Sequence, residues 1–179
     1  LDPRSNIALQ VFEAFRTEGL WTGAYFSKPD WHSEYYWWRK FPPADRNCNY
    51  SIIKHPDQWQ KFINYTHHQI DELLSDYGKI DILWLDGVWV RKTTEEETKK
   101  YLTEIYEDSR YSRNPQSQDI DMESIVKNAR LKQPGIIVVD RAVPGIFQNY
   151  LTPEQHIPET GLSSPWATCM TMATSWSSV

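Results

Sequence analysis

Apolar residues gather in short runs along the chain, and glycine, proline or polar residues bound each run. Residues 80–85 form a nearly continuous apolar run, and residues 136–139 form a second run of isoleucine and valine. Short runs of this kind are typical of strands that are buried on both faces, as in a parallel sheet. Residues 22–27 predict a third strand, earlier in the chain.

Helical spacing of apolar residues separates the predicted strands. Helices are predicted over residues 5–18, with Ser5 as the N-cap, and over residues 56–75 and 121–133. Residues 91–118 are charged and polar, and the acidic and basic residues at 95–100 predict a solvated helix face. Strands that alternate with helices predict an α/β fold with a parallel sheet.

Large aromatic side chains crowd the loop predicted over residues 29–43. It holds Trp31, His32 and the run Tyr35-Tyr36-Trp37-Trp38. Long ordered loops in compact domains are often functional. His32 and the aromatic run either line a binding subsite or pack the loop onto the domain, and the sequence leaves both interpretations open.

Charged residues follow two of the predicted strands. Asp86 comes at the end of the run 80–85 and precedes Gly87, and Asp140-Arg141 follows the run 136–139. Ligands bind at the carboxyl ends of strands in barrels and open α/β sheets. Asp86 is therefore either a site residue or a structural residue that caps the next element or forms a turn with Gly87.

Composition narrows the choice of partner. The net charge of -5 and the pI near 5.5 argue against nucleic acid and anionic membranes. Nine tryptophans and ten tyrosines offer flat apolar faces with a polar edge, which suits stacking on sugar rings. No run approaches the roughly 20 apolar residues that a membrane span needs.

No metal or cofactor motif is present in the sequence. His67 and His68 are adjacent on a predicted helix and therefore point in different directions, and Cys48 and Cys169 match no metal or redox spacing. The chain contains neither a glycine-rich phosphate loop nor the nucleophile elbow of serine hydrolases. These observations give no support to a metal site at the two histidines, to nucleotide binding or to serine hydrolase chemistry.

Asp86 and Glu154 together suggest one chemistry. Two carboxyl groups can cleave a glycosidic bond when one attacks and the other donates a proton to the leaving oxygen. A cation such as Arg141 would keep the attacking group ionised, and Trp84, Trp31 or Tyr25 would hold the sugar. Glu154 could equally belong to a helix start at residues 152–154.

Several motifs occur in one order along nearly the whole chain and resemble the α-L-fucosidases of glycoside hydrolase family 29. They are residues 25–32 (Tyr-Phe-Ser-Lys-Pro-Asp-Trp-His), 77–87 (ending Trp-Leu-Asp-Gly), 139–141 (Val-Asp-Arg), 152–155 (Thr-Pro-Glu-Gln), 157–159 (Ile-Pro-Glu) and 166–176 (with Trp-x-x-Cys-Met-Thr-Met and Ser-Trp). Residues 91–118 resemble the family least.

The resemblance implies retaining hydrolysis of terminal α-L-fucose from a fucosylated oligosaccharide or glycoconjugate. It places the nucleophile on Asp86, and Glu154 is the expected acid/base, with Glu159 as the alternative. The sugar-binding positions are Tyr25, Trp84 and Arg141, to which the aromatic loop adds Trp31 and His32. Double displacement requires the two carboxyl groups to lie roughly 5 Å apart and uses no cofactor.

The implied fold is a partial (β/α)₈ TIM-like barrel whose N-terminal strands are missing. The whole chain, residues 1–179, is expected to be a fragment of one catalytic domain, since Leu1 opens directly on a helix. An upstream His-His-Asp-Gly segment of the family is absent, and Ala167 replaces a glutamate of its closing motif. Full-length relatives are exported or lysosomal, which sets the expected location; the oligomeric state stays open.

Two alternatives to this function stay open, and the departures from the family motifs motivate the first of them. One is a degenerate module that binds fucose without turnover, and the other is a different barrel glycosidase such as a hexosaminidase. The combination of Trp-x-Asp-Gly with Thr-Pro-Glu-Gln argues against the second alternative.

Overall fold

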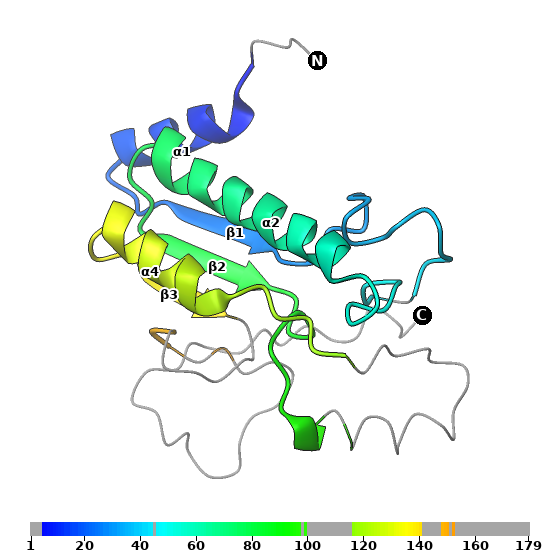
Figure 1. Cartoon of the computed structure of the whole chain (residues 1–179). Helices are drawn as coiled ribbons and strands as arrows, with labels where there is room; N and C mark the ends of the chain where they lie inside the picture. Colours follow the sequence, from blue (N-terminus) through cyan, green and yellow to red (C-terminus); the bar gives the residue numbers. More distant parts are fainter. Residues whose placement is uncertain are drawn as a thin grey trace, which may run out of the picture.

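The computed structural model describes residues 5–44, 46–97, 99, 116–140, 148–150 and 152. Three parallel strands form one sheet in the order β1-β2-β3, and helices connect them (Figure 1). In chain order the elements are α1 (Ile7–Thr17), β1 (Gly23–Ser27), α2 (Pro56–Asp76), β2 (Ile82–Asp86), α4 (Met122–Lys132) and β3 (Ile137–Asp140). The predicted α/β fold with a parallel sheet is confirmed.

The element boundaries differ from the predicted ones by one or two residues. The N-cap of α1 is Asn6, whose side-chain oxygen accepts a hydrogen bond from the backbone N–H of Leu9 at 3.0 Å, so the prediction of Ser5 was wrong. Two adjacent residues were suitable caps, and the N–H geometry selects one of them. Strand β2 extends to Asp86, which pairs in register with Ser27.

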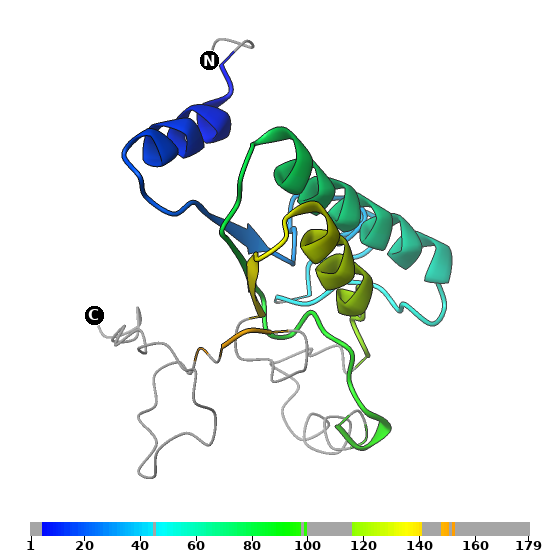
Figure 2. The same cartoon turned by 90° about the vertical axis from the view of Figure 1, so that its left-hand side faces the viewer.

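Helices α2 and α4 cover one face of the sheet (Figure 2). Their buried side chains meet those of the strands in one hydrophobic core, which includes Phe62, Ile70, Leu74, Leu83, Leu85, Ile125, Val126, Ala129 and Val138. This burial is the main stabilising contribution to the fold, since each such side chain contributes roughly 1.5–3 kcal/mol when it leaves water. No helix in the described ranges is long and apolar enough to cross a bilayer.

Helix α1 lies apart from this layer, near the amino ends of the strands (Figure 2). Its Phe12 ring meets Tyr77 edge-on at 6.1 Å, and the Arg16 guanidinium donates to the carbonyl of Lys79 at 3.1 Å. No residue of α1 is fully buried, and the apolar side chains of Ile7, Val11 and Phe15 remain exposed.

The second face of the sheet carries Tyr25, Trp84 and Asp86, and α2 and α4 do not cover it. Tyr25 pairs with Trp84 in the β1–β2 register, so the two side chains point to the same face. Three strands make up the described sheet, which is open in these residues, and the expected (β/α)₈ barrel therefore stays a prediction. The single catalytic domain expected over residues 1–179 stays a prediction as well.

The chain segment after β1 crosses the end of β2. The backbone N–H of Lys28 donates to the carbonyl of Asp86 at 3.0 Å, and Pro29 packs against Gly87. Gly87 has a φ of +94°, and a Cβ atom there would lie 2.4 Å from the Pro29 Cδ atom. Only glycine fits this position without a shift of the proline ring.

Replacing Gly87 with alanine should therefore destabilise the protein more than the same replacement at Gly135. Gly135 has a similar φ of +88° but open space around it. We expect Gly135→Ala to cost about 1–2 kcal/mol for the left-handed backbone alone, and Gly87→Ala to cost roughly 1–3 kcal/mol more because of the added clash. Urea unfolding measures both losses, and equal losses would show that the Pro29 contact is unimportant.

Candidate active site

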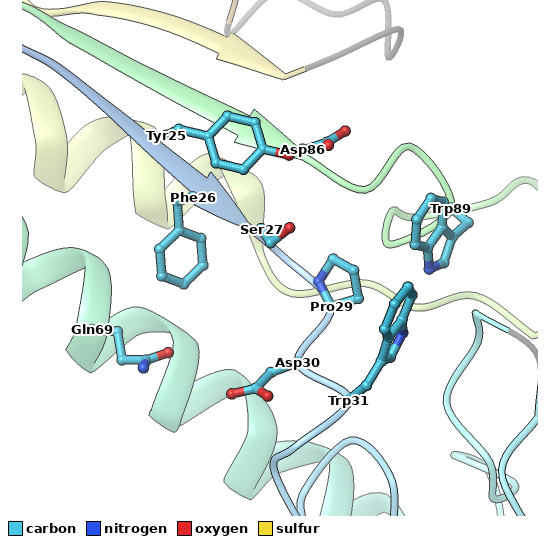
Figure 3. Close-up of a pocket in the computed structure, with 9 residues that line it drawn as sticks. All are labelled: Tyr25, Phe26, Ser27, Pro29, Asp30, Trp31, Gln69, Asp86 and Trp89. Carbon is cyan, nitrogen blue, oxygen red and sulfur yellow. Dashed lines mark hydrogen bonds between the residues drawn. The ribbon is translucent and has the colours of Figure 1, made fainter. Parts of the chain in front are cut away.

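Asp86 is the last residue of β2 and is half-buried at the carboxyl end of the sheet. Its Oδ1 atom accepts a hydrogen bond from the backbone N–H of Gly87 at 2.8 Å, and its Oδ2 atom accepts one from the Tyr25 hydroxyl group. Donors on both oxygens stabilise the ionised carboxylate relative to the neutral acid. The turn with Gly87 therefore forms, and it leaves Asp86 directed toward Tyr25 (Figure 3).

Tyr25 and Trp84 form a stacked pair beside this carboxylate. Their ring centroids lie 5.2 Å apart with an interplanar angle of 18°. Adjacent parallel strands place register partners side by side, so the stack follows directly from the β1–β2 pairing. Tyr25 is 62% exposed although it is a large aromatic residue in a strand, which leaves its ring accessible to a ligand.

A pocket of about 430 Å³ opens beside Asp86. Its lining consists of Tyr25, Phe26, Ser27, Pro29, Asp30, Trp31, Gln69, Asp86 and Trp89. Figure 3 shows the indole rings of Trp31 and Trp89 close to each other on the side of the pocket beyond Pro29. The volume is in the range of small-molecule sites, and the combination of aromatic rings with carboxylates suits a polar ligand that has apolar faces, such as a sugar.

One backbone carbonyl holds both of these indoles. The Arg46 carbonyl oxygen accepts hydrogen bonds from Trp31 Nε1 at 3.2 Å, from Trp89 Nε1 at 2.8 Å and from the Tyr36 hydroxyl at 2.9 Å. The Arg46 guanidinium also lies over the Trp89 ring, 5.1 Å from its centroid. These contacts fix the orientation of the two rings relative to Asp86.

A buried glutamine, Gln118, connects the groups that hold the two indole rings. Gln118 accepts hydrogen bonds from the Tyr36 hydroxyl at 2.9 Å and from the Cys48 backbone N–H at 3.0 Å. It donates to Asn47 Oδ1 at 2.9 Å and to the Trp89 carbonyl at 3.3 Å. Burial raises the pKa of the Cys48 thiol to about 11, so this cysteine is a protonated structural group.

The aromatic loop mostly packs onto the domain. Tyr36 is fully buried, Trp38 contacts Tyr50 edge-on, and Trp37 stacks on Trp31 with ring centroids 5.7 Å apart. This stack covers one face of Trp31, which is still 52% exposed. For Tyr36 and Trp38 the packing interpretation is therefore correct, whereas Trp31 also lines the pocket.

His32 lies on the same loop but does not line the pocket. Its backbone N–H donates to Asp30 Oδ1 at 2.8 Å, and the Ser33 N–H donates to the same oxygen at 3.0 Å. Asp30 Oδ2 accepts a hydrogen bond from the Tyr65 hydroxyl at 3.2 Å, and burial together with this carboxylate raises the pKa of Tyr65. Asp30 thus closes a turn that sets the direction of Trp31.

A buried cation, Lys28, contacts Asp86 at the carboxyl ends of the strands through its backbone N–H. Lys28 is 1% exposed, and its ammonium group contacts Asp140 Oδ1 at 2.5 Å. Arg141, the cation expected from the sequence, lies outside the described residues, as do Glu154, Glu159 and Ala167. The structure therefore brings together Asp86, Tyr25 and Trp84, with Trp31 across the pocket.

No cluster of three or more histidine, cysteine, aspartate or glutamate side chains within the described ranges could hold a metal ion. His67 Nε2 instead bonds to the Ile120 carbonyl at 2.7 Å and connects α2 to the segment before α4.

Sequence reasoning did not identify Lys28, Trp89 or Gln118 as parts of this region. Trp89 follows Gly87 closely enough to have been a candidate, since a large aromatic residue just after a strand end faces the same edge. Lys28 stands inside the Tyr-Phe-Ser-Lys-Pro-Asp-Trp-His motif. No local signal marked it as buried.

The chain is similar to α-L-fucosidases in both sequence and fold. It resembles α-L-fucosidase isoenzyme 1 from Paenibacillus thiaminolyticus with a TM-score of 0.52 and 25% identity, over 86% of this chain and 33% of that chain. The structure of α-L-fucosidase AlfC from Lactobacillus casei in complex with α-L-fucose product gives a TM-score of 0.49 and 20% identity, over 88% of this chain and 44% of that one. The comparison with curated proteins gave no match.

The chain spans about a third of the length of the Paenibacillus enzyme. The family model described as Alpha-L-fucosidase matches residues 1–178. Since that match covers nearly all of its residues, the chain belongs to the α-L-fucosidase family of glycoside hydrolases.

Proposed function

We propose that this chain is part of the catalytic (β/α)₈ barrel of a retaining exo-α-L-fucosidase that hydrolyses terminal α-L-fucose from fucosylated glycans. The observation that carries the proposal is the Asp86 carboxylate at the carboxyl end of β2. Hydrogen bonds from Tyr25 and Gly87 favour its ionised form, and it opens onto an aromatic-lined pocket. Family membership supports fucose as the sugar.

In the proposed mechanism Asp86 attacks the anomeric carbon of fucose while the bond to the leaving oxygen breaks. Glu154 donates its proton to that oxygen, and a covalent fucosyl–Asp86 ester forms. Glu154 then accepts a proton from water, the water oxygen attacks the anomeric carbon, and the ester bond breaks. Two inversions give fucose with its original anomeric configuration, and the reaction needs only carboxyl groups and water.

The remaining site residues bind the substrate in this proposal. Tyr25 and Trp84 offer their stacked rings to the fucose beside Asp86, and Arg141 supplies positive charge to the site. Trp31 receives the sugar next to the fucose, because its ring lines the far side of the pocket and half of its surface is exposed. His32 belongs to the same loop and is proposed to contact the more distant part of the glycan.

Replacing the nucleophile should abolish ordinary turnover and permit rescue. We expect Asp86→Gly to lower the rate on an aryl α-L-fucoside roughly 10³-fold or more. Azide should restore turnover by attacking the anomeric carbon as the aryloxide leaves, and NMR should identify the product as β-L-fucosyl azide. The exposed Asp76→Asn variant, at the end of α2, is the matched control and should keep the wild-type rate. An Asp86→Gly protein with wild-type activity would exclude Asp86 as the nucleophile.

The acid/base can be assigned by comparing leaving groups. Glu154→Gln should slow hydrolysis of a fucosyl disaccharide by roughly 10²–10⁴-fold, because its sugar leaving group needs a proton. It should leave α-L-fucosyl fluoride hydrolysis nearly unchanged in the first step, because fluoride departs without one. Glu159→Gln is expected to affect both substrates equally. The reverse pattern would transfer the acid/base role to Glu159.

The role of Trp31 is separable from that of the fucose pocket. Trp31→Ala should lower kcat/KM for an α-L-fucosyl-N-acetylglucosamine disaccharide roughly three- to tenfold, the loss expected from one aromatic stacking contact. Fucosyl fluoride carries no second sugar, so its kcat/KM should not change. Trp21→Ala serves as the control, since Trp21 is 67% exposed and precedes the amino end of β1. Equal losses on both substrates would place Trp31 in a purely structural role.

A further inference from the structure

A buried salt bridge crosses the carboxyl end of β2. Lys28 follows β1 directly, Asp140 is the last residue of β3, and β2 lies between these two strands in the sheet. The Lys28 Nζ and Asp140 Oδ1 atoms are 2.5 Å apart, and the residues are only 1% and 7% exposed. The bridge therefore spans the strand that carries Asp86.

The bridge lies on the helix-covered side of that strand. Asp140 pairs in register with Leu85, which is fully buried in the core, and the side chain of Asp86 points to the opposite face with Tyr25. The backbone N–H of Lys28 donates to the Asp86 carbonyl at 3.0 Å. Lys28 thus contacts the last peptide of β2 through its backbone and β3 through its side chain.

Stability alone does not explain two charges at this place. Removing a lysine and an aspartate from water costs several kcal/mol for each ion, and well-packed apolar residues often replace such a pair with no loss. Burial lowers the pKa of Lys28 and raises the pKa of Asp140, while their mutual attraction opposes both changes. The contact between Lys28 Nζ and Asp140 Oδ1 is what favours the charged forms of both groups against this effect of burial.

Asp86 is one of the groups on which both charges act. Lys28 and Asp140 each interact electrostatically with Asp86, the lysine attractively and the aspartate repulsively. Further titratable groups among the described residues of this region include Tyr25, which donates to the Asp86 carboxylate, Asp30 in the pocket lining, and Arg91 after β2, which interacts with both members of the bridge. Arg91 is also paired with Glu97 at 2.7 Å.

We propose that Lys28 and Asp140 form a positioning pair for Asp86, which fixes the last peptide of β2 and sets the proton affinity of the Asp86 carboxylate through two opposed charges. The catalytic meaning of this inference rests on the proposed function of Asp86. Its electrostatic part does not, because it can be measured without turnover.

The test is a titration of Asp86 by carbon NMR in protein labelled with ¹³C-aspartate, with the Asp86 signal identified by its loss in Asp86→Asn. Lys28→Met removes the attractive charge and should raise the pKa of Asp86, whereas Asp140→Asn removes the repulsive charge and should lower it. Each change should be roughly half a unit to one unit. The double variant Lys28→Met/Asp140→Asn should titrate close to the wild type.

The salt bridge at the other end of the same strand provides the control. Lys79 Nζ lies 2.5 Å from Asp81 Oδ1, and Lys79→Met removes a lysine from an ion pair without touching the carboxyl end of β2. It should leave the Asp86 titration unchanged. Shifts of the same sign in Lys28→Met and Asp140→Asn, or no shift in either, would overturn the proposal. If Lys28→Met does not fold, Asp140→Asn decides alone, and an unchanged or raised Asp86 pKa contradicts the proposal.

Kinetic measurements then distinguish a failure of the positioning pair from a failure of the proposed function. If the chain turns over fucosyl fluoride, the acidic limb of kcat/KM should move in the same order as the NMR titrations. If the titrations move as expected but no variant and no wild-type protein hydrolyses a fucoside, the proposed function fails while the positioning pair stands.

Discussion

The fixed parallel register between β1 and β2 determines where the groups of the candidate site lie. It places Tyr25 beside Trp84 and ends with Ser27 beside Asp86. A slip of one residue would turn the Asp86 side chain into the helix-covered core and expose Leu85 in its place. The buried leucines of β2 therefore hold the register, and the register in turn places a carboxylate and an aromatic stack on the uncovered face.

The loop that follows β1 orients further side chains at the pocket. The Arg46 carbonyl accepts hydrogen bonds from two indoles and one phenol, and Gln118 connects the same loop to the segment after β2. Most contacts in this loop serve packing, which explains why so many aromatic residues occur in a chain of this size. From this loop, the residues that line the pocket are Pro29, Asp30 and Trp31.

Strands and helices were predictable because their apolar periodicity is strong. The hydrogen-bonded position of Asp86 at the end of β2 was predictable because a carboxylate after a buried strand is costly unless it has a partner. Lys28 was not predictable, since lysine is almost never fully buried unless paired and its partner is 112 residues away in the chain. The Arg46 contribution was also hidden, because a backbone carbonyl has no sequence signature. Ser5 failed as a cap because Asn6 is an equally good candidate one residue later.

The contact between Gly87 and Pro29 links two positions that are 58 residues apart in the sequence. A side chain larger than hydrogen at position 87 becomes acceptable only when residue 29 moves, and residue 29 adjoins the lysine that bridges to β3. Asp86-Gly87 at the end of β2 and Lys28-Pro29 after β1 must therefore match each other in any variant of the protein. Recombination with a distant relative should preserve the site only when both segments come from the same parent.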